Sequence, residues 1–130
     1  MACILVVDDE RHVTRLIRLR LEGAGYQVET AHDGTEALER LERGGFDAVV
    51  TDFNMPRMDG QELCEAIRAR FPEHPLPIFL MTARIDSALR AWAESLPGID
   101  YLEKPISLRE LVSRLESLKL GAAEAAGGAG

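Results

Sequence analysis

The feature that most constrains this chain is a set of three short runs in which nearly every residue is apolar. Strands that are apolar at every position, rather than at every second one, are typical of a sheet covered on both faces. Two shorter and more polar segments predict further strands, the first of them at an edge of the sheet. The predicted strands are Ile4–Val7, Gln27–Thr30, Asp47–Thr51, Ile78–Met81 and Ile99–Leu102.

The segments between these strands carry apolar residues at helical spacing. In the first of them Val13, Ile17 and Leu21 recur with the period of an α-helix, and glycines follow. Strand and helix alternate five times, and parallel strands need crossovers that helices supply. We therefore expect an α/β fold, a doubly wound five-stranded parallel sheet with helices on both faces. The predicted helices are Val13–Leu21, Thr35–Arg43, Gln61–Arg70, Asp86–Leu96 and Leu108–Leu120.

Length and composition fit a single globular domain. The 130 residues are 46% hydrophobic and 28% charged, which argues against disorder over most of the chain. Residues 1–120 are expected to form the domain, and the Ala/Gly-rich residues 121–130 are expected to be a disordered tail or a linker stub. A net charge of −7 disfavours direct binding to nucleic acid.

The first residues do not read as an export signal. Their apolar run is very short and meets Asp8 and Asp9, so it is neither a signal peptide nor a membrane span. We expect a cytoplasmic protein without membrane contact. Cys3 and Cys64 lack the spacing of metal ligands, and two reduced structural thiols are expected rather than a disulfide.

Charged and hydroxyl side chains stand at the carboxyl ends of the predicted strands. Asp8 and Asp9 follow the first strand, Asp52 the third, Thr82 the fourth and Lys104 the fifth. In doubly wound sheets these ends meet at the functional crevice. Two like charges about 5 Å apart repel by roughly 3 kcal/mol at an effective dielectric of about 20, so one lysine does not balance three carboxylates. We expect a bound cation, and all-oxygen ligands with open positions favour Mg2+.

This constellation predicts phosphoryl chemistry. With a metal ion and Lys104 screening the rim, Asp52 can attack a phosphoryl donor and give an aspartyl phosphate. Mg2+ and Lys104 would neutralise the phosphoryl oxygens, and the Thr82 hydroxyl would hydrogen-bond one of them. The competing interpretation is structural: Asp8 and Asp9 as helix N-terminal acids, Thr82 as an ordinary strand end, and Lys104 as a surface cation. The presence of all five residues favours the site.

Five separated segments occur in a recognisable order and spacing. They are Val7-Asp8-Asp9, Asp52, Met55-Pro56-Arg57-Met58-Asp59-Gly60, Thr82-Ala83 and Tyr101-Leu102-Glu103-Lys104-Pro105. Together they resemble the receiver domain of two-component response regulators, over Cys3 to about Leu120, and are most similar to single-domain chemotaxis-type regulators. The resemblance implies a flavodoxin-like receiver fold with strand order 2-1-3-4-5.

The resemblance implies a role for each acidic residue. Asp52 would be the phosphoacceptor. Asp9 would bind Mg2+ directly and Asp8 mainly through water, with the backbone carbonyl of Asn54 as the third protein ligand beside Asp52. The side chains of Asn54 and Arg84 would flank the path of the hydrolytic water, so we expect them to tune the lifetime of the phosphorylated state.

The remaining site residues would contact the phosphoryl group and change conformation when it is present. Thr82 and Lys104 would contact the phosphoryl group, and a cis peptide bond would join Lys104 to Pro105. Tyr101 would turn inward when Thr82 moves to the phosphate. At the places where the family usually carries Gly-Ala, this chain has Pro97 and Gly98, and that departure lies beside Tyr101.

The resemblance also implies partners. A histidine kinase or phosphotransfer domain would supply the phosphoryl group and dock on the first helix. Phosphorylation would then shift the face formed by the fourth helix, fifth strand and last helix, which controls a downstream protein effector. The chain would be a monomer or a phosphorylation-dependent homodimer. It would not be an enzyme in the usual sense, since it would catalyse only its own phosphorylation and dephosphorylation.

Two other functions use the same residues. Haloacid-dehalogenase-type phosphotransferases share the Asp nucleophile, Mg2+, Thr and Lys, but need a second acid two residues after the nucleophile, where this chain has Asn54. A degenerate receiver would act as a constitutive interaction module. His12, His32 and His74 are expected to be surface residues, and Trp92 is either core packing or part of the output face.

Overall fold

The computed structural model describes residues 1–73 and 75–120. Strands and helices alternate along the whole described chain. The elements are β1 (Cys3–Val7), α1 (Arg11–Gly23), β2 (Gln27–Ala31), α2 (Gly34–Glu42), β3 (Ala48–Asp52), α3 (Gly60–Arg70), β4 (Ile78–Thr82), α4 (Ser87–Glu94), β5 (Ile99–Glu103) and α5 (Leu108–Ser117). The expected tail, residues 121–130, and the expected surface position of His74 lie outside the described residues.

The five strands form one parallel sheet in the order β2-β1-β3-β4-β5, which confirms the expected doubly wound topology. Every neighbouring pair is parallel, and the register sets the carboxyl ends side by side. Val7 pairs with Thr51, Asp52 with Met81, and Thr82 with Glu103. The order changes direction between β1 and β3, so the crevice expected of such sheets lies beyond the ends of those strands.

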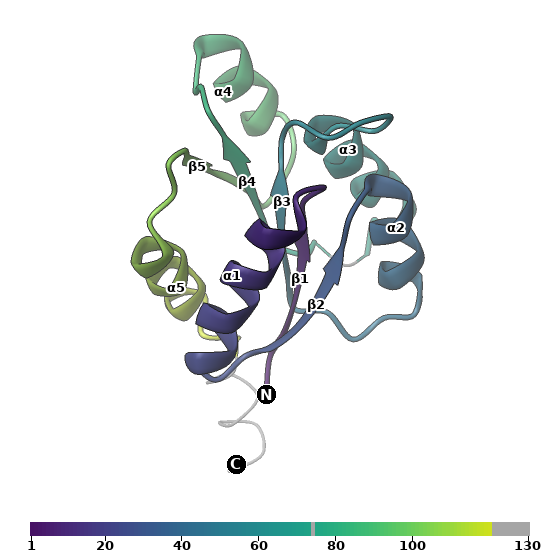
Figure 1. The fold of residues 1–130 in the computed structure, drawn as a ribbon. Coiled ribbons are helices and arrows are strands. Elements are labelled where there is room, and N and C mark those ends of the chain that lie inside the picture. The colour runs from purple at the N-terminus through teal and green to yellow at the C-terminus, as the bar shows by residue number, and fades with distance from the viewer. Residues whose placement is uncertain (74, 121–130) are drawn as a thin grey trace.

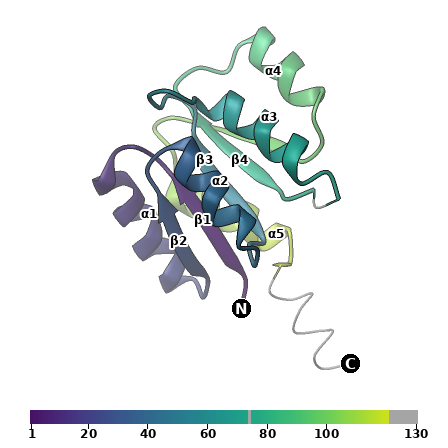
Figure 2. The same cartoon turned by 90° about the vertical axis from the view of Figure 1, so that its right-hand side faces the viewer.

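Helices cover both faces of the sheet (Figures 1 and 2). On one face, α1 and α5 pack onto alternate strand residues such as Ile4, Val6 and Val50. On the other face, α2 and α3 pack onto the residues between them, such as Leu5 and Val49. Because alternate residues of a strand point to opposite faces, both sets must be apolar, which explains the continuous apolar runs.

Local side chains fix where several elements begin. Asp47 was expected in the third strand, but β3 begins at Ala48, and the Asp47 carboxylate accepts a hydrogen bond from the backbone N–H of Cys3 at 2.8 Å. Asp86 was expected inside a helix but is the N-cap of α4, where its side chain accepts from the N–H of Leu89 at 2.9 Å. Asp and Asn side chains at such positions satisfy N–H groups that a helix leaves unpaired.

The last two helices end earlier than expected. Helix α4 ends at Glu94, with Ser95 as its C-cap, rather than continuing to Leu96. Helix α5 ends at Ser117 rather than Leu120, and Lys119 has a positive φ of 57°, which a continuing helix does not allow. Among the described residues, no helix combines the length and apolar character needed to cross a membrane.

Candidate functional site

The candidate site lies where four of the five strands end. Asp52 is the last residue of β3 and Thr82 the last residue of β4, while Asp8 follows β1 directly. The ladder continues past the strand ends: the N–H of Asp8 donates to Ala31 O at 3.1 Å, and that of Lys104 donates to Thr82 O at 2.7 Å. Asp8, Asp52, Thr82 and Lys104 are therefore held in place by the backbone hydrogen bonds of the sheet.

Three carboxylates converge at this rim, as the sequence predicted. One oxygen from each of Asp8, Asp9 and Asp52 lies within 4.8 Å of the others. Asp8 and Asp52 are buried, at 1% and 3% exposure, and Asp9 is exposed. At that separation each pair of charges repels by roughly 3 kcal/mol at an effective dielectric of about 20. Without a bound cation, this repulsion lowers the free energy of unfolding. Such a cost is expected at a place where a cation binds.

Burial dominates the electrostatics of the two inner acids. It raises the pKa of Asp8 from 3.8 to about 6, opposed by a hydrogen bond from the N–H of Glu10 at 3.0 Å and reinforced by the charge of Asp52. Burial also raises the pKa of Asp52, opposed chiefly by Lys104. Near neutral pH these groups are thus stabilised by any cation that enters the rim.

Lys104 supplies an ammonium group to the rim. Its Nζ lies 2.5 Å from Asp52 Oδ1. Partial burial works to lower the pKa of Lys104, but the hydrogen bond and charge of Asp52 outweigh it, so the pKa is raised and the lysine stays charged. The peptide bond between Lys104 and Pro105 is cis, the isomer that the sequence resemblance implied.

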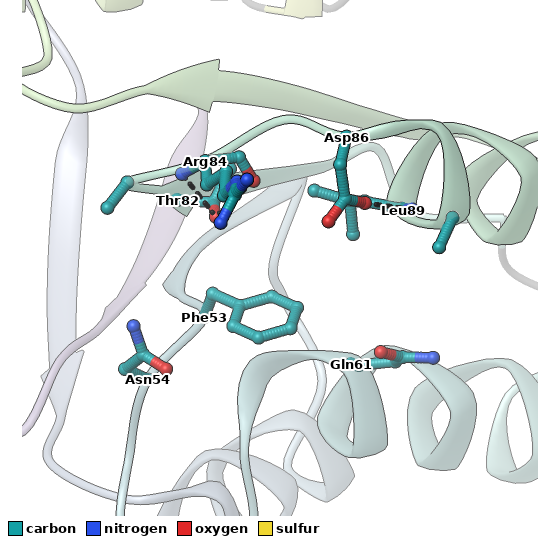
Figure 3. Close-up of a pocket in the computed structure, with 9 residues that line it drawn as sticks. Phe53, Asn54, Gln61, Thr82, Arg84, Asp86 and Leu89 are labelled. Atoms are coloured by element: carbon teal, nitrogen blue, oxygen red, sulfur yellow. Dashed lines mark hydrogen bonds between the residues drawn. The ribbon is translucent and has the colours of Figure 1, made fainter.

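Thr82, Asn54 and Arg84 border a hollow of about 360 Å³ beside the acids. Figure 3 shows Asn54 on one side of this hollow and Thr82 with Arg84 on the other. The Thr82 hydroxyl accepts from the N–H of Arg84 at 3.2 Å and donates to Arg84 O at 3.1 Å. A ligand that accepts a hydrogen bond from the Thr82 hydroxyl must therefore replace the bond that this hydroxyl donates to Arg84 O.

Tyr101 lies one strand away from Thr82. It is half-buried on β5, pairs in register with Leu80, and packs against the core on the α2–α3 side. The unusual Pro97 and Gly98 before β5 are held by Arg68, whose Nε donates to Pro97 O at 2.8 Å and whose Nη2 donates to Leu76 O at 2.6 Å. Arg68 thus fixes the entry to β5, and the sequence offered no signal for this role.

Gly60 is a second residue whose role emerges only in three dimensions. A Cβ on Gly60 would lie 2.4 Å from Asp52 O and 2.8 Å from Phe53 Cα, and the Gly60 N–H donates to Phe53 O at 2.7 Å. Helix α3 therefore packs directly against the backbone that carries Asp52. An Asp59–Glu62 capping box, visible in the sequence as Asp-Gly-Gln-Glu, starts that helix.

The other side chains singled out in the sequence take ordinary positions. Cys3 and Cys64 are free thiols, and burial raises the pKa of Cys64 to about 12, which leaves it unreactive. His12 is exposed and His32 half-buried. Trp92 is half-buried in the α2–α3 side of the core and also donates from Nε1 to Glu65 Oε2 at 3.0 Å, which ties α4 to α3.

Comparisons with known proteins agree with this geometry. The family model "Response regulator receiver domain" matches residues 4–116. "Response regulator MprA" of Mycobacterium ulcerans is 44% identical over 115 residues, which are 88% of this chain and 49% of that protein, and the protein of that name from Mycobacterium tuberculosis is also 44% identical. The chain spans about half the length of the curated relatives it matches.

Solved structures show the same architecture. Chemotaxis protein CheY4 of Vibrio cholerae has a TM-score of 0.83 and 32% identity, over 90% of this chain and 98% of that one. The receiver domain of the Francisella response regulator 1452 has a TM-score of 0.82 and 30% identity, over 91% and 96%. Each likeness therefore covers most of the chain rather than one motif.

Proposed function

The chain belongs to the response regulator receiver domain family, and from that membership we propose that Asp52 accepts a phosphoryl group and that the fold converts its presence into a change of surface. The observation that carries the proposal is the position of Asp52. It is a buried carboxylate at the mouth of β3, within 4.8 Å of two further carboxylates and paired with Lys104. A purely structural aspartate gains from pairing with Lys104 but not from two further carboxylates nearby.

The donor set fits Mg2+. Three carboxylates of which two are buried form an oxygen-rich, strongly negative rim, and hard divalent cations prefer such ligands. Asp8, Asp9 and Asp52 would hold the ion, with the backbone carbonyl of Asn54 as a further ligand. When bound, Mg2+ would supply positive charge to the phosphoryl oxygens.

The protein's own groups would do the rest of the chemistry. An oxygen of Asp52 forms a bond to phosphorus while the bond from phosphorus to the donor nitrogen breaks, and the electron pair of that bond stays on the donor imidazole. Lys104 neutralises charge on the transferred group from its place beside Asp52. The Thr82 hydroxyl leaves Arg84 O and donates to a phosphoryl oxygen.

The hydroxyl of Thr82 is the start of the proposed switch. Once Thr82 moves toward the phosphoryl group, space opens at the end of β4, and Tyr101 turns into it. The strand pairing of β4 with β5 would carry this change to the face of α4, β5 and α5. We propose that this face controls a downstream protein effector, as a monomer or as a phosphorylation-dependent homodimer.

The proposed phosphodonor is a histidine kinase or phosphotransfer domain that docks on α1. Two leucines of α1 are unusually exposed, Leu16 at 58% and Leu19 at 63%. Beside them lies a hollow of about 590 Å³ between α1 and the start of α5, lined by apolar residues such as Val13 and Ile106 and reaching Lys104. An apolar surface next to the acceptor suits a partner that must deliver a phosphoryl group there.

Loss of the phosphoryl group would be the chain's own activity. Asn54 and Arg84 face the hollow beside Thr82, and a hydrolytic water would approach through it. Their size and charge would set the lifetime of the phosphorylated state. Receiver domains are regulatory phosphoacceptors, so no turnover of an external substrate is proposed.

Labelling with acetyl phosphate tests the proposal. We expect one phosphoryl group per chain with Mg2+ present and none when EDTA replaces it. Asp52→Asn should abolish labelling, and Asp47→Asn, an acid outside the rim, should leave it intact. Labelling of Asp52→Asn at the wild-type level would overturn the assignment.

A further inference from the structure

A hollow between α1 and the edge strand β2 gathers positive charge. Its volume is about 190 Å³, and none of its lining residues is acidic. Helix α1 contributes three arginines and a threonine, and the end of β2 contributes a threonine and a histidine. The lining residues are Arg11, Thr14, Arg15, Arg18, Thr30 and His32.

The three arginines lie on one face of α1. Arg11, Arg15 and Arg18 are spaced by four and three residues, which places them above one another on a helix. Like charges at this spacing repel, and the chain has 22 acidic residues against 15 basic ones, so neutralising partners are plentiful. The three guanidinium groups along one wall therefore repel one another weakly, and an anion between them would relieve this repulsion.

Few acids approach these arginines. Arg18 donates from Nε to Glu22 at 3.1 Å, but Arg11 and Arg15 form no ion pair or side-chain hydrogen bond with any described residue. Some other arginines of the chain do have acidic partners. Arg40 pairs with Glu29 and Glu36, and Arg114 pairs with Asp100 and Glu110. Arg11 and Arg15 differ from other arginines that lack an ion pair within the described residues, such as Arg20 and Arg109, in that they line one hollow together with Arg18.

The opposite wall supplies neutral donors. Val28 packs into the cluster beneath α1, so Thr30, two residues on, faces the same side of the sheet. The Thr30 hydroxyl forms no hydrogen bond within the described part of the chain. His32 is oriented by Glu36, whose Oε1 lies 3.5 Å from Nδ1, which leaves Nε2 free. Thr14 is already committed, because its hydroxyl donates to Arg11 O at 2.9 Å.

We propose that this α1–β2 hollow is an anion site for the phosphate or diphosphate group of a small molecule. Guanidinium groups match phosphate oxygens with paired hydrogen bonds, and a hydroxyl and an imidazole complete a directional donor set. A volume of about 190 Å³ leaves room for a group of that size. The site is separate from the acidic rim, whose three carboxylates repel such a ligand.

The test is a titration of the isotope-labelled chain with inorganic phosphate, pyrophosphate and ADP, at constant ionic strength and with EDTA to keep Mg2+ from the rim. We expect saturable NMR shifts at the amides of Thr30 and His32, with pyrophosphate binding more tightly than phosphate. ADP binding more tightly than pyrophosphate identifies a nucleotide source, and equal binding identifies the diphosphate group alone.

Matched variants separate the site from general charge. Arg11→Gln with Arg15→Gln should weaken pyrophosphate binding by about tenfold or more, while Arg20→Gln, on the same helix but outside the hollow, should not. Thr30→Val keeps every charge and should weaken binding several-fold, and thermal unfolding checks that each variant folds. Equal weakening by Arg20→Gln, shifts outside the hollow, or tighter binding of an acidic glutamate peptide than of pyrophosphate would overturn the proposal.

Discussion

Replacing Asp8 by asparagine is expected to stabilise the metal-free protein at neutral pH. Asp8 is 1% exposed, and burial raises its pKa from 3.8 to about 6. Between these pH values the folded state binds more protons than the unfolded state, so the free energy of unfolding falls as pH rises through this range. Above this range, ionisation of Asp8 lowers the free energy of unfolding by about 3 kcal/mol in total, because each tenfold change in proton affinity corresponds to about 1.4 kcal/mol.

Asparagine removes this cost without removing the local hydrogen bond. Its side-chain oxygen can still accept from the N–H of Glu10, as Asp8 Oδ1 does at 3.0 Å. Urea denaturation in EDTA should therefore give Asp8→Asn a free energy of unfolding about 2 to 3 kcal/mol above wild type near pH 7. Near pH 4 the two proteins should be almost equal, since Asp8 is protonated in the folded wild type there. Glu94→Gln, an exposed carboxylate on α4, serves as the control and should change little.

Mg2+ should reduce the advantage of Asp8→Asn. A ligand at ten times its dissociation constant stabilises a protein by about 1.4 kcal/mol, and Asp8→Asn should gain much less of this than wild type. A free energy of unfolding lower for Asp8→Asn than for wild type near pH 7 in EDTA would refute a burial cost at Asp8. The same dependence of stability on pH between 4 and 6 in the two proteins would refute it equally.

Three further substitutions test how the rim is supported. Gly60→Ala should cost about 1 to 3 kcal/mol in urea denaturation, because its Cβ would meet Asp52 O at 2.4 Å, whereas Gly23→Ala, with nothing within 4 Å, should be close to neutral. Arg68→Ala should lower the free energy of unfolding by about 2 to 3 kcal/mol, because it removes two hydrogen bonds to backbone carbonyls. Arg70→Ala loses only an exposed ion pair with Glu42 and should cost less than about 1 kcal/mol. Equal costs for the two variants would contradict the role of Arg68 at the entry to β5. Arg84→Ala should change the rate of dephosphorylation more than that of phosphorylation, followed by loss of label after the donor is removed, and a rate equal to that of wild type would count against this role.

Much of the fold follows from local sequence signals. The apolar runs identified β1, β3 and β4, since a strand buried on both faces leaves no room for alternation. The strand-end rule brought Asp8, Asp9 and Asp52 to one rim, and the structure places their carboxylates within 4.8 Å. Apolar runs do not specify which strands are neighbours, so the order of the strands was predicted from the resemblance to receiver domains instead.

The parts that escaped the sequence depend on contacts between distant residues. In the sequence, Arg68 on α3 looks like an ordinary surface residue of a helix. In the structure it donates hydrogen bonds to backbone carbonyls 8 and 29 residues away. The small size of Gly60 matters because α3 approaches the backbone of Asp52, which lies eight residues earlier in the chain. Helix ends were also misplaced, since the early stop of α5 is decided by the backbone at Lys119 rather than by the apolar pattern.

The residue that carries the phosphoryl group can be located by its chemistry. After treatment with acetyl phosphate and Mg2+, borohydride reduces an aspartyl phosphate to homoserine, which mass spectrometry of peptides assigns to a residue. We expect homoserine at position 52, dependent on Mg2+ and absent from every other aspartate. Homoserine at Asp8 or Asp9, or phosphate found only on histidine, serine or threonine, would contradict it.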